Sequence, residues 1–254
     1  MTGGGGDLVQ GRRGNDEIVG GGGAETPRGK SGADLIYANG AGTRAEGGDG
    51  DDDLRGSGAT EILLGDAGDD YIVTGGGGDT ADGGAGDDEI TGGGGAETLL
   101  GGDGADLIHA NGAGTRADGG EGDDVIEGSA ATETLLGGLG NDRIVTGGGG
   151  DTAAGGAGDD TLIGGTGADR LKGGNGRDVI DGGPVRTGSM AAAGPIRSPA
   201  ARMPTRSTAT TATTRSTRGR ETTRWMAAWA RTRLSAEAVG TPCLEAARRT
   251  NCAK

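Results

Sequence analysis

A nine-residue repeat runs through most of the sequence, from residue 11 to residue 181. Its pattern is G-G-x-G-x-D-x-U-x, where U is a large aliphatic residue, and eleven segments follow it in one register with few departures. Examples are GGAGDDEIT at 83, GGDGADLIH at 101 and GGEGDDVIE at 119. A short fixed period of this kind indicates a solenoid, because one unit cannot bury its single apolar side chain alone and must stack on its neighbours.

The composition excludes a conventional globular core. The chain has 63 Gly, no Phe, two Tyr and two Trp, and both Trp lie beyond residue 184. Residues 1–183 must therefore build their interior from Ile, Leu, Val and Ala. Such a composition is also typical of disordered Gly-rich segments, but the regular period favours stacked units that share a thin core.

The charge divides the chain near the same place. Residues 1–183 carry 35 acidic and 11 basic side chains, whereas residues 184–254 carry 3 acidic and 13 basic ones. An acidic body of this kind is not expected to bind nucleic acid, and it attracts cations. No apolar run approaches the length that spans a bilayer, so we expect no membrane insertion by this segment.

The repeat resembles the calcium-binding nonapeptide of the repeats-in-toxin (RTX) family over residues 2 to 183. The resemblance implies an all-β fold, a parallel β-roll of stacked 18-residue coils with two nonapeptides in each coil. The chemistry agrees, because Gly permits positive φ in a six-residue turn and Asp at position six adds an oxygen ligand that Ca²⁺ prefers. Three strand residues follow each turn, and the U side chain among them is expected to point inward.

Repeats that match well recur every 18 residues, so they share one edge of the expected roll. The RTX family holds each ion between turns that are two nonapeptides apart, which implies that the aspartates of this edge form a ladder of Ca²⁺ ligands. The ladder is predicted to consist of Asp16, Asp34, Asp52, Asp70, Asp88, Asp106, Asp124, Asp142, Asp160 and Asp178. The aliphatic residue two positions after each aspartate, from Ile18 to Leu162, is predicted to form the core.

Turns on the opposite edge depart from the pattern. Position six holds Glu, Thr or Asp in different turns, and Ala replaces the fourth Gly in four of them. Glu is one methylene longer than Asp, and Thr has no charge. We therefore expect weak or empty calcium sites on this edge until Asp169, which completes the set of predicted ligands. The inward residues of this half alternate between Leu and Ala, from Leu63 to Ala153.

No catalytic constellation is evident in the repeat region. Residues 20–91 and 92–163 are identical at 52 of 72 positions, as expected for a duplicated four-coil block. Duplication of this kind favours a binding module over an enzyme, whose reacting residues must be unique. His109 is expected to face solvent at position nine, and the Ser residues have no His partner for a triad.

Residues 184–254 keep the nine-residue period with different amino acids. Thr recurs at position six, for example at Thr205, Thr214 and Thr223, and Ser, Trp, Leu or Cys follows two residues later. Thr codons begin with AC, and a preceding G would give GAC, which encodes Asp. We therefore interpret this tail as RTX sequence translated out of frame, and we predict that it is disordered. The alternative is a genuine Arg/Thr-rich basic linker, which would not explain the conserved phase.

The resemblance also sets the functional expectation. It implies a Ca²⁺-binding module of an extracellular bacterial protein, exported unfolded by a type I secretion system and folding when it meets external calcium. RTX proteins carry their export signal at the C-terminus, and here that end is out of frame. Two alternatives are the detached repeat region of a secreted RTX protease, lipase or hemolysin, and a Ca²⁺-dependent adhesive or ice-binding roll. The second would need a dense outward array of Thr or Asn, which the sequence does not show.

Overall fold

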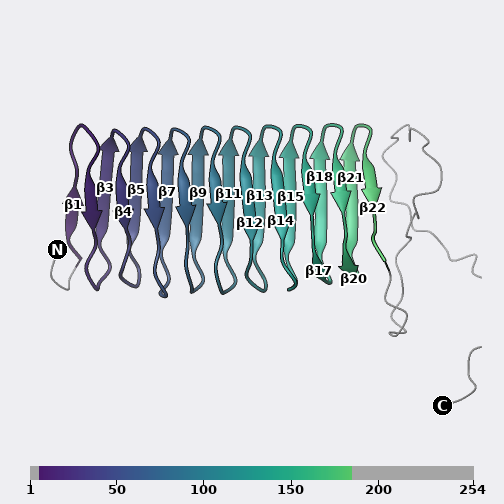
Figure 1. The fold of residues 1–254 in the computed structure, drawn as a ribbon, viewed down its shortest axis with the longest axis horizontal. Coiled ribbons are helices and arrows are strands. Elements are labelled where there is room, and N and C mark those ends of the chain that lie inside the picture. The colour runs from purple at the N-terminus through teal and green to yellow at the C-terminus, as the bar shows by residue number, and fades with distance from the viewer. Residues whose placement is uncertain (1–5, 185–254) are drawn as a thin grey trace, which may run out of the picture. The chain divides into compact units, whose positions relative to one another are not determined.

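Short parallel strands account for all the regular structure of residues 6–184, the part of the chain that the computed structural model describes. The chain winds as a roll of stacked coils, and each coil contributes one strand to each of two ten-stranded sheets (Figure 1). No helix long and apolar enough to cross a bilayer occurs among these residues. Apart from Pro184, the tail predicted for residues 184–254 lies outside the described part.

Each sheet follows the order of the chain, and every strand except those at the two ends pairs with the strand 18 residues before it and the strand 18 residues after it. The first sheet comprises β1 (Leu8–Gln10), β3 (Thr26–Ser31), β5 (Arg44–Asp49), β7 (Ile62–Ala67), β9 (Thr80–Ala85), β11 (Thr98–Asp103), β13 (Arg116–Glu121), β15 (Thr134–Leu139), β18 (Thr152–Ala157) and β21 (Arg170–Asn175).

The second sheet comprises β2 (Glu17–Val19), β4 (Leu35–Tyr37), β6 (Asp53–Arg55), β8 (Tyr71–Val73), β10 (Glu89–Thr91), β12 (Leu107–Ala110), β14 (Val125–Gly128), β16 (Arg143–Val145), β19 (Thr161–Ile163) and β22 (Val179–Asp181). A minor third sheet pairs β17 (Gly148–Gly149) with β20 (Thr166–Gly167) at one edge of the roll. The predicted parallel roll of 18-residue coils is therefore confirmed.

Strands of the first sheet are longer than the sequence pattern predicts. The pattern gives three strand residues after each turn, as in most strands of the second sheet, but β11 and its neighbours have six. The extra residues are the opening Gly-Gly-x of the next nonapeptide, and Gly102 pairs with Gly84 and Gly120 in register. Turn residues therefore continue the parallel ladder on one side of each coil.

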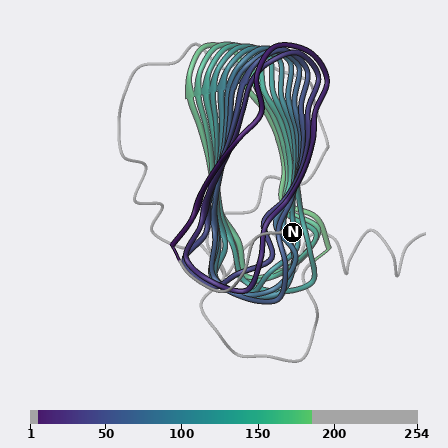
Figure 2. The ribbon, with the colours of Figure 1, turned by 90° about the vertical axis from the view of Figure 1, so that its left-hand side faces the viewer.

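Figure 2 shows the two sheets facing each other along the roll. The buried core consists mainly of one column of aliphatic side chains from each sheet. The predicted inward residues from Ile18 to Leu162 are all buried, and Ile90 lies between Ile72 and Ile108 in the second sheet. The first sheet contributes the alternating Leu and Ala residues from Leu63 to Ala153, also buried as predicted. One aliphatic residue per nonapeptide is little apolar burial against the ordering of nine residues. The turns must therefore contribute to stability.

Two edges join the sheets, and they differ in regularity. We call the turns that precede the strands of the second sheet the aspartate edge, and those that precede the strands of the first sheet the mixed edge. In Figure 2 the turns of the aspartate edge, at the top, follow one another closely, whereas those of the mixed edge diverge. The candidate ligands lie on these two edges.

Candidate metal centre

The predicted ladder forms as one continuous row along the aspartate edge. Each position-six Asp ends its turn and is followed at once by a strand of the second sheet, as Asp106 is by β12. Its backbone is therefore held by the parallel ladder: the Leu107 N–H donates to the Asp88 carbonyl oxygen at 2.8 Å. Because the coils repeat every 18 residues, the carboxylates of successive coils are about 4.8 Å apart along the roll, the usual strand spacing.

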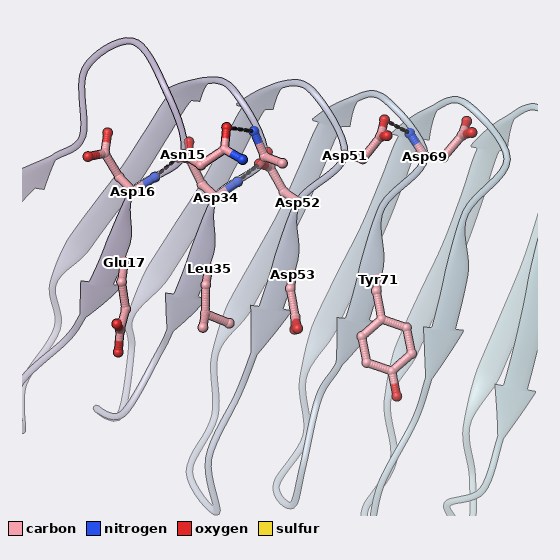
Figure 3. A pocket seen from close by; sticks show the side chains of 11 residues that line it. Asn15, Asp16, Glu17, Asp34, Leu35, Asp51, Asp52, Asp53, Asp69 and Tyr71 are labelled. Carbon is pink, nitrogen blue, oxygen red and sulfur yellow. Dashed lines mark hydrogen bonds between the residues drawn. The ribbon is translucent and has the colours of Figure 1, made fainter.

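Hydrogen bonds link each ladder aspartate to the next. The Asp88 N–H donates to Asp106 Oδ1 at 2.8 Å, and the Asp106 N–H donates to Asp124 Oδ1 at 2.9 Å. The same bond recurs at all nine junctions between the ten ladder aspartates, at 2.7 to 3.2 Å. Figure 3 shows the first junctions, from Asp16 through Asp34 to Asp52. One carboxylate oxygen of each pair thus fixes the register of adjacent coils.

The other carboxylate oxygen is left without a partner at the interior of the row. In eight ladder residues Oδ2 is buried and accepts no hydrogen bond: Asp34, Asp52, Asp70, Asp88, Asp106, Asp124, Asp142 and Asp160. The two end members are half-buried, and Asp16 Oδ2 accepts the Arg12 N–H at 2.8 Å. An ionised oxygen buried without a partner is costly, so a repeated row of them indicates a positively charged ligand.

Glycine at the first position of the nonapeptide makes room for this oxygen. A Cβ at Gly101 would overlap both Asp106 Oδ2 and the Gly119 carbonyl oxygen of the next coil. The unpartnered carboxylate oxygen and a backbone carbonyl oxygen therefore converge over the same Cα atom. Gly104 shapes the remaining turn, because its φ of 141° is strained for a residue with a side chain.

The electrostatics also favour a cation at this edge. Burial raises the pKa of Asp70, Asp88 and Asp124 to about 7, and that of Asp106 to about 6. The accepted backbone N–H lowers the pKa of each group, but nearby aspartate charges raise it further. A cation placed among these carboxylates would remove the cost of keeping them ionised.

The ligand set along this edge suits Ca²⁺. Among residues 6–184, no three Asp, Glu, His or Cys side chains converge as a metal-binding group. A cation at this edge would meet carboxylates of adjacent coils and backbone carbonyl oxygens. Ca²⁺ accepts six to eight such oxygens in flexible geometry, whereas Zn²⁺ favours nitrogen and sulfur ligands in a compact tetrahedron.

Three aspartates of the mixed edge adopt the ladder arrangement as well. The Glu61 N–H donates to Asp79 Oδ1 at 2.7 Å, and the Asp151 N–H donates to Asp169 Oδ1 at 3.0 Å. Asp151 Oδ1 in turn accepts the Glu133 N–H, and Oδ2 of Asp79, Asp151 and Asp169 is buried without a partner.

Of these three, only Asp169 is among the ligands predicted from the sequence. The intact GGGGD segments that end at Asp79 and Asp151 are the signal that could have identified the other two.

The glutamates of the mixed edge use their carboxylates differently. Each accepts a hydrogen bond from the residue four positions earlier in its own turn. The Gly21 N–H donates to Glu25 Oε2 at 2.7 Å, and the Ser129 hydroxyl donates to Glu133. The longer side chain therefore returns to its own coil, whereas the Asp side chains bridge to the coil before. Glu133 still has one oxygen, Oε2, that is buried without a partner.

Outside the two edges, the described residues offer few chemical features. His109 faces outward from β12, as predicted, with its Nδ1 atom 3.3 Å from Glu127 Oε2. A shallow groove of about 490 Å³ runs beside the first three ladder aspartates, and most of its lining is acidic side chains together with Tyr71 (Figure 3). This groove belongs to the aspartate edge and has no separate set of reactive groups.

Comparison with known protein families agrees with this chemistry. The sequence model for the RTX calcium-binding nonapeptide repeat matches residues 1–36, 37–72, 73–108, 109–144, 118–153 and 154–184. The matches together cover the whole of the roll and more than two thirds of the chain. No curated protein matches the chain at a significant level.

Proposed function

Because the chain belongs to the RTX calcium-binding nonapeptide repeat family, it is a Ca²⁺-binding repeat module, and we propose that the aspartate edge is its principal calcium site. The observation that carries this proposal is the row of eight buried, unpartnered Oδ2 atoms. The proposed ligands are the ten ladder aspartates with Asp169 on the mixed edge, and the geometry adds Asp79 and Asp151. Bound Ca²⁺ would supply the positive charge that these carboxylates lack.

Each residue type in the turn has a distinct role in this proposal. Asp Oδ1 accepts the N–H of the preceding coil and fixes the register, which leaves Oδ2 for the ion. Gly at position one leaves space for Oδ2 beside the carbonyl oxygen of the next coil. Gly at position four permits the positive φ of the turn.

We further propose that calcium binding folds the roll. Without a cation, closely spaced carboxylates would have to be buried together, and the thin aliphatic core is a weak driving force against the chain entropy of a Gly-rich sequence. Binding free energy then becomes folding free energy, as in other small metal-dependent modules. The expected affinity is in the range of extracellular modules, about 10⁻⁴ to 10⁻³ M.

Family membership supports a proposal for the biological setting. We propose that the roll is a structural, non-catalytic part of an extracellular bacterial protein that a type I secretion system exports. Low calcium inside the cell would keep the segment unfolded for export, and higher calcium outside would fold it. The calcium dependence of the fold is the physical property that this role requires.

Two neighbouring aspartates of one turn provide a matched test. Asp124 is buried in the ladder, whereas Asp123 is exposed and accepts the Asn141 N–H at 2.6 Å. Asp124→Asn and Asp123→Asn remove the same charge and keep an acceptor oxygen. Circular dichroism of the full chain during calcium titration should show a coil-to-β change that vanishes in chelator. Asp124→Asn should shift its midpoint to higher calcium, and Asp123→Asn should not.

Identical spectra with calcium and with chelator would refute calcium-coupled folding. Equal midpoints for the two variants would refute the assignment of the buried ladder as the ligand set.

A further inference from the structure

The mixed edge contains two copies of an unusual turn, with the sequence ANGAGT at residues 38–43 and 110–115. In these turns Asn stands at position two and Thr at position six. Thr43 and Thr115 are fully buried at the positions that correspond to the ladder aspartates. Because the two turns lie in the two halves of the duplicated block, they provide independent examples of the same geometry.

Each ANGAGT turn donates two side-chain hydrogen bonds to carbonyl oxygens of the preceding turn. The Asn111 amide donates to the Gly92 carbonyl oxygen at 2.9 Å, and the Thr115 hydroxyl donates to that of Gly95 at 3.2 Å. In the other copy, Asn39 donates to Gly20 at 3.1 Å and Thr43 donates to Gly23 at 2.9 Å. In both copies, side-chain donors of the protein itself therefore satisfy the carbonyl oxygens at the same two positions of the preceding turn.

The carboxylate of the preceding turn is also engaged elsewhere. Both Glu97 oxygens accept the Gly93 N–H at 3.0 Å, and Oε1 accepts the buried Thr74 hydroxyl at 2.9 Å. Glu25 Oε2 accepts the Gly21 N–H in the equivalent turn. Thr115 Oγ1 also takes the place of Asp Oδ1, since it accepts the Glu97 N–H at 3.4 Å.

The ladder turns differ from these turns in the kind of atom that they present. An ionised Asp at position six has only acceptor oxygens, so it cannot satisfy a neighbouring carbonyl oxygen and leaves that task to a cation. Asn and Thr carry N–H and O–H donors. A turn with these donors needs no cation, and the donated protons occupy the space in which a cation would meet the carbonyl oxygens.

We propose that Asn39, Thr43, Asn111 and Thr115 are specificity-determining residues that exclude calcium from their turns. These side chains close two junctions of the mixed edge by hydrogen bonds alone, and calcium on that edge is confined to the turns of Asp79, Asp151 and Asp169. The proposal rests on the proposed calcium-binding function and deepens it, because it sets which junctions bind an ion.

The test counts the ions bound to the full chain in saturating calcium, by equilibrium dialysis and atomic emission. Asn111→Gly with Thr115→Asp restores the acceptor pattern of a ladder turn. Asn111→Ala with Thr115→Val removes both donors and adds no ligand, and it is the matched control. The restored turn should bind about one additional ion per chain, and the control should bind the same number as the parent chain.

The same pair of changes at Asn39 and Thr43 repeats the test in the other half of the block, so one misfolded variant does not decide the result. Circular dichroism in calcium identifies the folded variants. A folded restored turn without an additional ion would overturn the proposal. If the parent chain binds no calcium at all, the proposed function itself fails, and this result is distinct from the first.

Discussion

Position six is Asp in all ten turns of the aspartate edge, whereas on the mixed edge it alternates between Glu and either Thr or Asp over two duplicated blocks. Both edges nevertheless join the same two sheets with the same 18-residue spacing. On the aspartate edge, carboxylates bridge neighbouring coils and leave buried oxygens without partners. On the mixed edge, most position-six side chains satisfy groups of their own or the preceding turn by hydrogen bonds.

The comparison shows that a coil of this kind can close in two chemically different ways. One presents acceptor oxygens alone and calls for a cation, and the other supplies donors from Asn, Thr and Ser side chains. We propose that the fold does not require an ion at every junction, and that calcium dependence is concentrated where the donors are missing, along the whole of the aspartate edge.

The largest difference in stability between the two edges should result from substitutions at position six in the middle of the roll. Asp106→Ala leaves the buried Asp88 N–H without an acceptor, which costs about 1–3 kcal/mol, and the lost calcium-binding free energy adds to this. Thr115→Ala removes two long neutral hydrogen bonds, each worth about 1 kcal/mol or less, and no ligand. Urea unfolding in saturating calcium measures both changes.

The calcium midpoint should rise much more for Asp106→Ala than for Thr115→Ala, which loses no ligand. Equal shifts in both quantities would mean that the two edges do not differ as described.

A somewhat smaller difference in stability is expected when one glycine of each edge is replaced by alanine. A Cβ at Gly101 would meet Asp106 Oδ2 and a backbone carbonyl oxygen, whereas one at Gly94 on the mixed edge would have no atom within 4 Å. Gly101→Ala should therefore destabilise the calcium-loaded roll by about 3 kcal/mol, the upper end of overpacking penalties. Gly94→Ala should change stability by no more than about 0.5 kcal/mol. A thermal melt of each variant in calcium measures the two changes in stability. Comparable losses of stability in the two variants would contradict the proposed packing of the ligand oxygen.

The smallest expected effect is the pH dependence of the calcium-free chain. Burial raises the pKa of Asp70 and Asp88 from 3.8 to about 7, so the folded roll binds protons that the unfolded chain releases between about pH 4 and pH 7. The stability that these carboxyl groups contribute to the folded roll is therefore greatest below pH 4, and it is lost as the pH rises through 7. The Thr43 and Thr115 turns have no carboxyl at position six and should not contribute.

In chelator, the β signal should grow modestly as the pH falls from 8 to 5. It should be nearly constant over that range in saturating calcium. A calcium-free chain with more β structure at pH 8 than at pH 5 would contradict the assignment of these raised pKa values to the folded roll.

Much of the fold could be predicted because the repeat is local and strict. The nonapeptide phase identifies the inward side chain, so Ile108 and Leu99 could be assigned to the core from the sequence alone. The 18-residue recurrence likewise placed Asp106 and Asp124 on one edge in adjacent coils.

The rest depends on contacts that the nonapeptide period does not encode. Asn111 meets Gly92, which is 19 residues away, and Thr115 meets Gly95 at a distance of 20 residues. Glu97 returns to Gly93 because its extra methylene gives it a different reach from Asp. These are choices among local hydrogen-bond partners, and they require the relative placement of two coils. The long strands of the first sheet have the same origin, since turn residues pair only when the neighbouring coil is in place.

Anomalous scattering from crystals grown with calcium, or with Tb³⁺ in its place, would locate the ions directly on each edge. We expect a continuous row of peaks beside the Oδ2 atoms of the aspartate edge from Asp34 to Asp160, further peaks at Asp79, Asp151 and Asp169, and none beside Thr43 or Thr115. A mixed edge as fully occupied as the aspartate edge, or an aspartate edge without a row of peaks, would contradict the proposal that calcium binds mainly along the aspartate edge.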